Sequence, residues 1–194
     1  MRAALGLAPD ALLLGMAARF HPQKDHQNFI QAAFYLHSTC PDAHFVLWGQ
    51  DIDWQNPDLA SWIDAIGLRK YFHLLGMRRD AAELTAALDV ASLSSCSSEA
   101  FPLVLGEAMA CEVPCVGTDV GDIRVMIGDI GKVVPRRDPT ALAQAWMEVL
   151  QMSPEDRLEL GRRGRQKVLE HYDIRQTAAQ YARLHRDIMG HRQR

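Results

Sequence analysis

Seven residues separate two carboxylates, Glu99 and Glu107, within the stretch 95–110. This stretch follows the apolar, strand-like run 90–93 and opens a helix-like run. A strand, a polar loop and a helix start together form a ligand-binding edge in an open α/β sheet. Backbone N–H groups at a helix start attract phosphate, and carboxylates accept hydrogen bonds from sugar hydroxyls. Phosphate donors beside hydroxyl acceptors indicate a site for a nucleotide-sugar.

Arg19 and Lys24 bring positive charge to the end of an earlier apolar run, 11–17. Because open α/β sheets bind ligands beyond the carboxyl ends of their strands, we expect both cations at the same edge as Glu99. Two fixed cations there would neutralise a diphosphate and favour a leaving group that gains charge. From spacing alone, a pair of ordinary surface cations is the competing interpretation.

Short apolar runs alternate with helix-like segments along the whole chain. This rhythm predicts an α/β fold, with a Rossmann-like open parallel sheet of about six strands and helices on both faces. The predicted strands are 11–17, 43–48, 72–75, 90–93, 114–117 and 131–134. Asp25, Asp138 and Ser153 are predicted to cap helices, because each stands immediately before a helix-like run. The segment 118–122 is predicted to be a turn.

Composition narrows the classes of function. The length suits one domain with a substantial core, and a net charge of −3 gives no reason to expect a nucleic-acid partner. Four cysteines without a Cys-x-x-Cys pair indicate reduced thiols in a cytoplasmic protein. Eight histidines form no ligand array, so we expect no metal site. No apolar run approaches the ~20 residues that a membrane span needs.

The segment 99–110 resembles the Glu-x7-Glu motif of retaining glycosyltransferases, specifically the large family 4 (group 1). Arg19 and Lys24 match the Arg-x4-Lys pattern of that family, and the resemblance covers roughly residues 15–186. It implies the C-terminal, donor-binding domain of the two-domain GT-B fold. We therefore expect residues 1–189 to form one nucleotide-sugar-binding domain, residues 190–194 to be a disordered tail, and an N-terminal acceptor domain to be absent from this chain.

The resemblance also implies a role for individual residues. Arg19, Lys24 and Glu99 are the expected catalytic residues: the two cations bind the diphosphate, and Glu99 positions the donor sugar and stabilises the transition state. Glu107 is expected to accept hydrogen bonds from the ribose. The other expected donor-binding residues are Gly49, Met77, Phe101, Pro102, Leu103 and Val104.

Structural roles are the alternatives at several of these positions. Glu99 could merely complement a helix dipole, and Glu107 could be an exposed helix residue. Met77, expected beside the nucleotide base, could be a core methionine, and Gly49 could be a plain turn glycine. Pro102 has no N–H to donate.

Three positions depart from the family pattern. Ala100 stands where glycine is commoner, Glu112 replaces a usual glycine, and Asp122 replaces the second glycine of a pair. If the backbone at Glu112 needs a positive φ, the strain would cost on the order of 1 kcal/mol. These departures put loop geometry in doubt more than the fold.

The expected function is retaining transfer of a glycosyl group from a UDP-, GDP- or ADP-linked sugar, without metal or another cofactor. The expected acceptor is a glycan or glycolipid in polysaccharide, lipopolysaccharide or glycolipid synthesis. We expect the fragment alone to be inactive without its N-terminal domain, and a peripheral place at the inner face of the membrane stays open for the full-length protein. The alternatives are a non-catalytic nucleotide-binding module and a nucleotide-sugar epimerase of the same fold.

Overall fold

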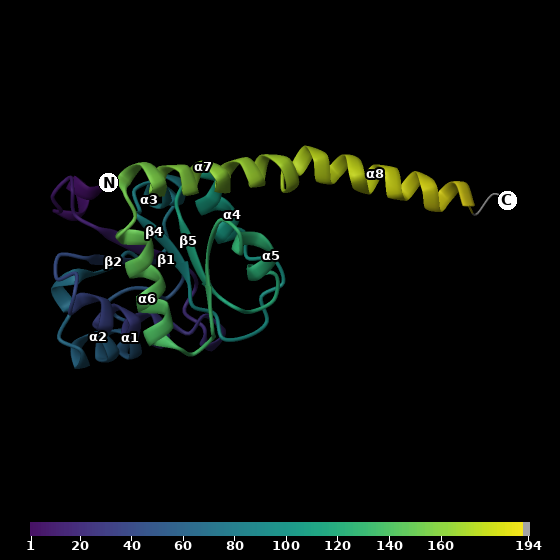
Figure 1. The fold of residues 1–194 in the computed structure, drawn as a ribbon. Helices are drawn as coiled ribbons and strands as arrows, with labels where there is room; N and C mark the ends of the chain where they lie inside the picture. The colour runs from purple at the N-terminus through teal and green to yellow at the C-terminus, as the bar shows by residue number, and fades with distance from the viewer. Residues whose placement is uncertain (192–194) are drawn as a thin grey trace.

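The computed structural model describes residues 1–191 and has one parallel sheet at its centre (Figure 1). The strand order is β3-β2-β1-β4-β5-β6. The strands are β1 (Leu13–Ala17), β2 (His44–Trp48), β3 (Phe72–Leu74), β4 (Val90–Leu93), β5 (Cys115–Thr118) and β6 (Gly131–Val134). All five pairs of neighbouring strands are parallel, so the predicted fold class is confirmed. Leu14 of β1 pairs with Phe45 of β2 on one side and Val90 of β4 on the other.

Helices cover both faces of the sheet (Figure 1). One face carries α1 (His26–His37), α2 (Pro57–Ala65) and α6 (Pro139–Leu150), because α1 packs against both α2 and α6. The other face carries α3 (Ala81–Ala86), α4 (Leu103–Ala110), α5 (Ile123–Ile127) and α7 (Pro154–His171). Three short 3₁₀ helices are η1 (Arg2–Leu5), η2 (Pro22–Lys24) and η3 (Arg69–Tyr71). Strand order reverses between β1 and β4, which is where ligands bind in open α/β sheets.

Local sequence signals set several helix starts. The side chains of Asp25, Asp138 and Ser153 each accept a hydrogen bond from a backbone N–H in the first turn of α1, α6 and α7, as predicted. α5 was not predicted. It is five residues long and its N-cap, Asp122, makes no side-chain capping bond, so it carries neither the length nor the cap signal of a helix.

Trp146 of α6 anchors the core on the α1 side of the sheet. Its ring is fully buried and lies 4.8 Å from the ring of Phe29 of α1, in an edge-on arrangement. Its Nε1 donates a hydrogen bond to Ser92 Oγ of β4 at 3.1 Å, which satisfies the buried indole. This packing fixes α1, and with it the loop that leads from β1 into α1.

On the opposite face, α7 lies against the end of α4. Glu112 has a φ of 61°, so the positive φ considered for this departure is confirmed. A Cβ on Gly161 of α7 would lie 1.9 Å from the carbonyl oxygen of Glu112. Only glycine therefore lets α7 approach the turn this closely.

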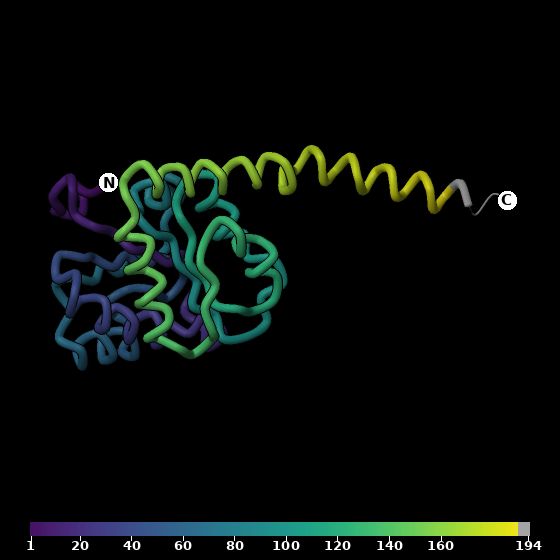
Figure 2. Tube along the Cα trace, viewed as in Figure 1, coloured from purple at the N-terminus to yellow at the C-terminus, as the bar shows by residue number. Residues whose placement is uncertain are grey.

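The last helix, α8 (Ile174–His191), extends away from the body (Figures 1 and 2). It remains helical past residue 189, and positions 192–194 of the predicted tail lie outside the described residues. Its large apolar side chains are exposed at Ile174, Tyr181, Leu184, Ile188 and Met189. No helix in the described part of the chain combines the length and apolarity needed to cross a membrane.

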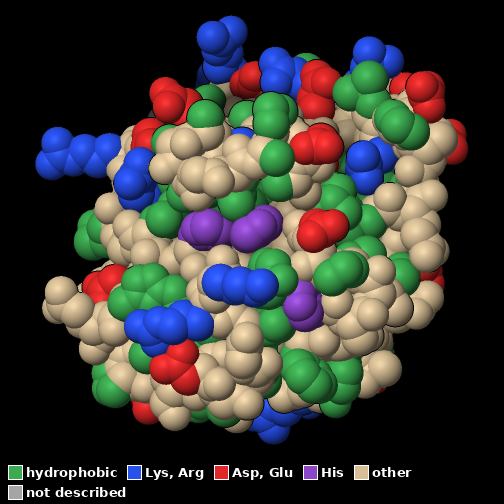
Figure 3. Space-filling view, turned by 90° about the vertical axis from the view of Figure 1, so that its left-hand side faces the viewer, with side chains coloured by type: hydrophobic (Ala, Val, Ile, Leu, Met, Phe, Trp, Pro, Cys, Tyr) green, Lys and Arg blue, Asp and Glu red, His purple; other side chains and the backbone are tan. Residues whose placement is uncertain are grey.

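The side of the molecule that faces left in Figure 1 carries mixed acidic and basic side chains, with histidines near its centre (Figure 3). The neighbouring strands β2 and β3 contribute a histidine pair: His73 Nε2 and His44 Nδ1 are 3.2 Å apart. Within residues 1–191, no three His, Cys, Asp or Glu side chains are placed to hold a metal ion.

Candidate functional site

Two loops meet where β1 and β4 end side by side. The loop after β1 carries Arg19 and Lys24, and the loop after β4 carries Glu99. Because both strands are parallel neighbours, their carboxyl ends open at one edge of the sheet. The structure thus brings the loop that carries Arg19 and Lys24 together with Glu99, the first carboxylate of the motif.

Lys24 and Glu99 form the centre of this site. Lys24 Nζ forms an ion pair with Glu99 Oε1, and Ser95 Oγ donates a hydrogen bond to the same oxygen. The two charged side chains are only 18% and 7% exposed, so the pair is largely shielded from solvent. Among the described residues, Glu99 Oε2 has no hydrogen-bond partner and stays available as an acceptor.

Further hydrogen bonds hold the two loops together. Ser94 Oγ lies 2.8 Å from the carbonyl oxygen of Lys24. The N–H of Cys96 donates to the carbonyl of Gln23 at 2.8 Å, and Gln23 Nε2 donates to the carbonyl of Ser98 at 2.9 Å. The position of Lys24 relative to Glu99 is therefore set by the backbone of both loops and not by the ion pair alone.

The end of β5 and the loop after it contact the segment that carries Glu99. Thr118 Oγ1 donates a hydrogen bond to the carbonyl of Ser95 at 2.5 Å. Gly121 has a φ of 55°, and a Cβ there would lie 1.3 Å from the carbonyl oxygen of Glu99. Lys24, Ser95, Glu99 and Gly121 are called the inner cluster below. Sequence reasoning missed Ser95 and Gly121 as site residues, although both stand in or beside segments it had singled out.

The start of α4 lies just beyond Glu99. Pro102 is the buried N-cap of α4, and the N–H groups of Leu103 and Val104 find no acceptor in the described part of the chain. These are the free donors expected at a helix start. Phe101 is 41% exposed, and its ring packs edge-on against Tyr172 at 5.0 Å. Leu103 is exposed, whereas Val104 packs partly against the core.

Arg19, Met77 and Glu107 are exposed around this centre and are called the outer set below. Met77 is 80% exposed, so the alternative of a core methionine is wrong. Neither Arg19 nor Glu107 forms an ion pair with another residue in 1–191. The outer set is thus free to contact a ligand, and nothing in the fold fixes its side chains.

The backbone at Gly49 requires glycine for a structural reason. Its φ is 145°, and a Cβ there would lie 2.2 Å from the carbonyl oxygen of Ala18. The glycine lets the loop after β2 touch the loop after β1. The other two departures strain no backbone, since neither Ala100 nor Asp122 has a positive φ.

Titratable groups beside Lys24 are shifted by their surroundings. Burial, together with the charge of Lys24, lowers the pKa of His26 from 6.5 to about 4, so this side chain is neutral at pH 7. Neither ring nitrogen of His26 has a hydrogen-bond partner in the described chain. Burial raises the pKa of Asp25.

The fold and the paired loops define an open α/β domain with a ligand-binding edge. Residues 11–152 match the family described as glycosyl transferases group 1. The chain belongs to this family.

Known proteins agree with this assignment. The chain is 31% identical over 192 residues to N-acetyl-alpha-D-glucosaminyl L-malate synthase of Bacillus anthracis, a match that covers 95% of this chain and 48% of that protein. Anabaena Alr3699/HepE, solved in complex with UDP and glucose, superimposes with a TM-score of 0.86 at 22% identity, over 96% of this chain and 51% of that one.

A third match is itself a single domain. The C-terminal domain of the glycosyl transferase group 1 protein LpcC from Francisella tularensis superimposes with a TM-score of 0.72 at 26% identity, over 84% of this chain and 87% of that one. The chain spans about half the length of the first relative and of the first structure named above.

Proposed function

We propose that this chain is the C-terminal, donor-binding half of a retaining glycosyltransferase, which binds a nucleoside diphosphate-sugar without a metal ion. The observation that carries the proposal is the shielded Lys24–Glu99 pair beside the free N–H groups of α4. It offers cationic and N–H donors for phosphate next to a carboxylate acceptor for sugar hydroxyls. The family assignment supports transferase chemistry at this edge.

The diphosphate would bind between the two loops. A lysine ammonium has three N–H donors, and Glu99 takes one from Lys24. The remaining donors, the exposed Arg19 guanidinium and the N–H groups of Leu103 and Val104 could all bind phosphate oxygens. Because charge develops on the diphosphate as the sugar leaves, these donors would stabilise the transition state more than the ground state.

The donor sugar would lie against Glu99. Glu99 Oε2 would accept a hydrogen bond from a sugar hydroxyl while Oε1 stays bound to Lys24 and Ser95. Its negative charge would stabilise the positive charge that develops on the sugar ring during glycosyl transfer. The sugar would then leave and be attacked on one face, which retains its configuration. Lys24 would link the leaving diphosphate to the carboxylate beside the sugar.

The outer set would bind the nucleoside. Glu107 lies about one turn into α4 and would accept hydrogen bonds from the ribose, while Met77 would pack against the base. A structural neighbour solved with UDP supports a nucleotide ligand for this fold but does not select UDP over GDP or ADP for this chain.

The rest of the reaction would need the part of the protein that this chain lacks relative to its relatives. That part would bind a glycan or glycolipid acceptor and close over the donor, so this half alone would be inactive. We place the reaction in the cytoplasm, where nucleotide-sugars are made available to polysaccharide, lipopolysaccharide or glycolipid assembly.

Calorimetric titration of the chain with UDP, GDP and ADP, each with and without magnesium, tests donor binding. We expect saturable binding of one nucleotide, unaffected by magnesium and weakened at least tenfold in Lys24→Ala. Equal binding by Lys24→Ala would remove Lys24 from the diphosphate site, and a requirement for magnesium would contradict the metal-free proposal.

Turnover in the longer protein tests catalysis. Glu99→Gln keeps the shape of the side chain but removes its charge, so kcat should fall by about 100-fold or more while donor affinity changes little. Full activity in this variant would rule out the proposed role of Glu99. A longer protein that binds nucleotide but transfers no sugar would favour the non-catalytic module.

A further inference from the structure

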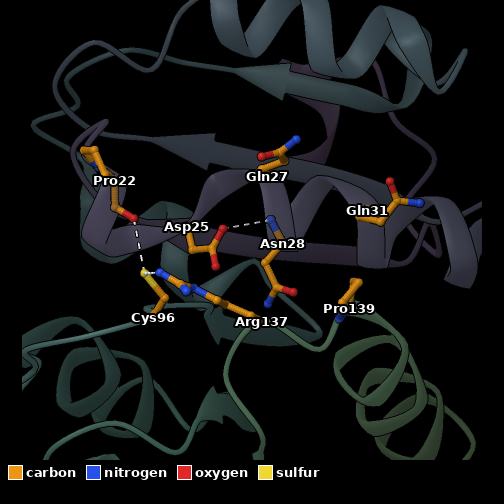
Figure 4. Close-up of a pocket in the computed structure, with 8 residues that line it drawn as sticks. All are labelled: Pro22, Asp25, Gln27, Asn28, Gln31, Cys96, Arg137 and Pro139. Atoms are coloured by element: carbon orange, nitrogen blue, oxygen red, sulfur yellow. Dashed lines mark hydrogen bonds between the residues drawn. The ribbon is translucent and has the colours of Figure 1, made fainter.

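A cavity lies on the α1 side of the same loops (Figure 4). Its volume is about 460 Å³, within the ~300–1,000 Å³ typical of small-molecule pockets. It is lined by Pro22, Asp25, Gln27, Asn28, Gln31, Cys96, Arg137 and Pro139. Neither Lys24 nor Glu99 lines it, so it is distinct from the candidate donor site.

Asn28 is the feature of this cavity that the fold does not explain. Its side chain is 6% exposed, and neither amide atom has a hydrogen-bond partner among the described residues. The backbone N–H of Asn28 donates a hydrogen bond to the side chain of Asp25, which caps α1. The side chain of Asn28 takes no part in this cap. Figure 4 shows the amide directed toward the Arg137 and Pro139 side of the cavity. Buried amides in folded proteins are almost always hydrogen-bonded, so this amide is available to a partner from outside the described chain.

Arg137 lies across the cavity and is loosely held. Its guanidinium makes one long contact, 4.0 Å to Cys96 Sγ, and no ion pair with a residue in 1–191. Movement of this exposed side chain would uncover the amide of Asn28 (Figure 4). Asp25 and Arg137 both have left-handed backbones, with φ values of 48° and 57°. Such strain in non-glycine residues tends to gather at ligand sites.

The cavity is lined by one acidic and one basic side chain, Asp25 and Arg137. Each would attract an ion that the other repels, so neither sign of charge is favoured on balance and a neutral ligand suits both. Hydroxyl groups both donate and accept hydrogen bonds, and could therefore satisfy a carboxylate, a guanidinium and both amide atoms of Asn28 together. The rings of Pro22 and Pro139 offer apolar surface to the C–H groups of such a ligand.

We propose that this cavity binds one neutral, hydroxyl-rich ring, such as a single sugar unit, through Asp25, Asn28 and Arg137. This inference does not rest on nucleotide binding at the inner cluster. The two sites share the loop that connects β1 to α1, so the ring would sit on the other side of that loop from Lys24.

Nuclear magnetic resonance of the isotope-labelled chain tests the proposal directly. The probes are glucose, galactose, N-acetylglucosamine and myo-inositol, with inorganic phosphate and ethylammonium as charged controls. We expect saturable shifts of the amide signals of Asp25, Asn28 and Arg137 with at least one neutral probe and not with either ion. Absence of saturable shifts with all four neutral probes would overturn the proposal, as would equal shifts with the ions.

Three variants separate a ligand role from a structural one. Asn28→Leu should weaken binding at least tenfold without lowering Tm, because the amide makes no hydrogen bond within the described chain. Arg137→Ala should also weaken binding at least tenfold. Lys24→Ala should abolish nucleotide binding and leave sugar binding unchanged. A failure of the proposed donor site can therefore be told from a failure of the cavity.

A matched pair controls for surface effects. Gln31→Ala removes an amide of α1 from the cavity wall and should weaken sugar binding several-fold. Gln144→Ala removes an exposed amide of α6 outside the cavity and should leave sugar binding unchanged. Unchanged binding in both Asn28→Leu and Arg137→Ala would disprove the assignment. A lower Tm in Asn28→Leu would show that the amide serves the fold instead.

Discussion

The inner cluster and the outer set differ in what holds them. Lys24 and Ser95 are both bonded to Glu99, and Gly121 lies against the backbone of Glu99. Arg19 and Glu107, by contrast, are exposed and form no ion pair within the described residues. The inner cluster is therefore set before a ligand arrives, whereas the outer set would be ordered by the ligand. Changes that disrupt the geometry of the inner cluster should affect stability and binding together, whereas changes in the outer set should affect binding alone.

Gly121→Ala should break the inner cluster most severely. The added Cβ would lie 1.3 Å from the Glu99 carbonyl oxygen, so the backbone of one loop must move. We expect a loss of about 3 kcal/mol or more in the free energy of unfolding, measured by urea denaturation. Nucleotide affinity should fall as well, because Glu99 moves.

Gly67→Ala is the matched control. Gly67 also has a positive φ, of 70°, but a Cβ there would meet no atom within 4 Å. It should cost only about 1 kcal/mol, the strain of a left-handed alanine, and leave binding intact. Equal losses in the two variants would mean that the contact with Glu99 adds nothing.

Acid pH should lower the free energy of unfolding through His26, which lies beside the inner cluster. Folded His26 has a pKa of about 4 against an ordinary 6.5, so between these values the unfolded chain binds a proton that the folded chain does not. Stability should therefore fall as pH drops from about 6.5 to 4, by up to about 3 kcal/mol.

The variant His26→Leu isolates this effect. Burial also lowers the pKa values of His44 and His73, which act in the same direction. Urea titrations at a series of pH values should show a shallower loss in the variant than in the wild type. Parallel curves would assign the acid sensitivity to other groups.

Lys24→Met should leave the carboxylate of Glu99 shielded and unpaired. Because Lys24 is partly exposed, we expect a loss of about 2 kcal/mol in unfolding free energy, below the range for fully buried pairs. Adding Glu99→Gln should recover most of this stability but none of the nucleotide affinity. A double variant no more stable than Lys24→Met would show that the pair does not act as a unit.

The smallest effects on stability should come from the outer set. Arg19→Ala and Glu107→Gln should each change the free energy of unfolding by less than about 0.5 kcal/mol, since both side chains are exposed. Nucleotide affinity, measured by calorimetry, should nevertheless fall several-fold in each. Full affinity in both variants would restrict the site to the inner cluster.

Much of this arrangement was predictable from sequence because its signals are local. Apolar runs marked the six strands, and Asp25, Asp138 and Ser153 marked three helix starts. The parallel sheet then placed Lys24 and Glu99 at one edge. The strain at Glu112 could also be anticipated, from a glycine that the family usually has there.

What sequence could not supply depends on contacts between distant segments. The fit of Gly121 against Glu99 and the bond from Thr118 to Ser95 connect the end of β5 and its loop to the loop after β4, and no spacing rule encodes them. The short α5 has neither length nor a cap to reveal it. The cavity at Asn28 needs α1, α6 and the β4 loop together, so it emerges only from the packed fold.

The ion pair between Lys24 and Glu99 spans 75 positions of the chain. It cannot form until β1 and β4 are adjacent, and such distant contacts form slowly because a long loop must close first. Neither half of the sheet can bind nucleotide through this pair by itself. A bound nucleotide would therefore stabilise only the completed fold. During refolding, the time at which nucleotide binding begins would report when β1 and β4 become adjacent.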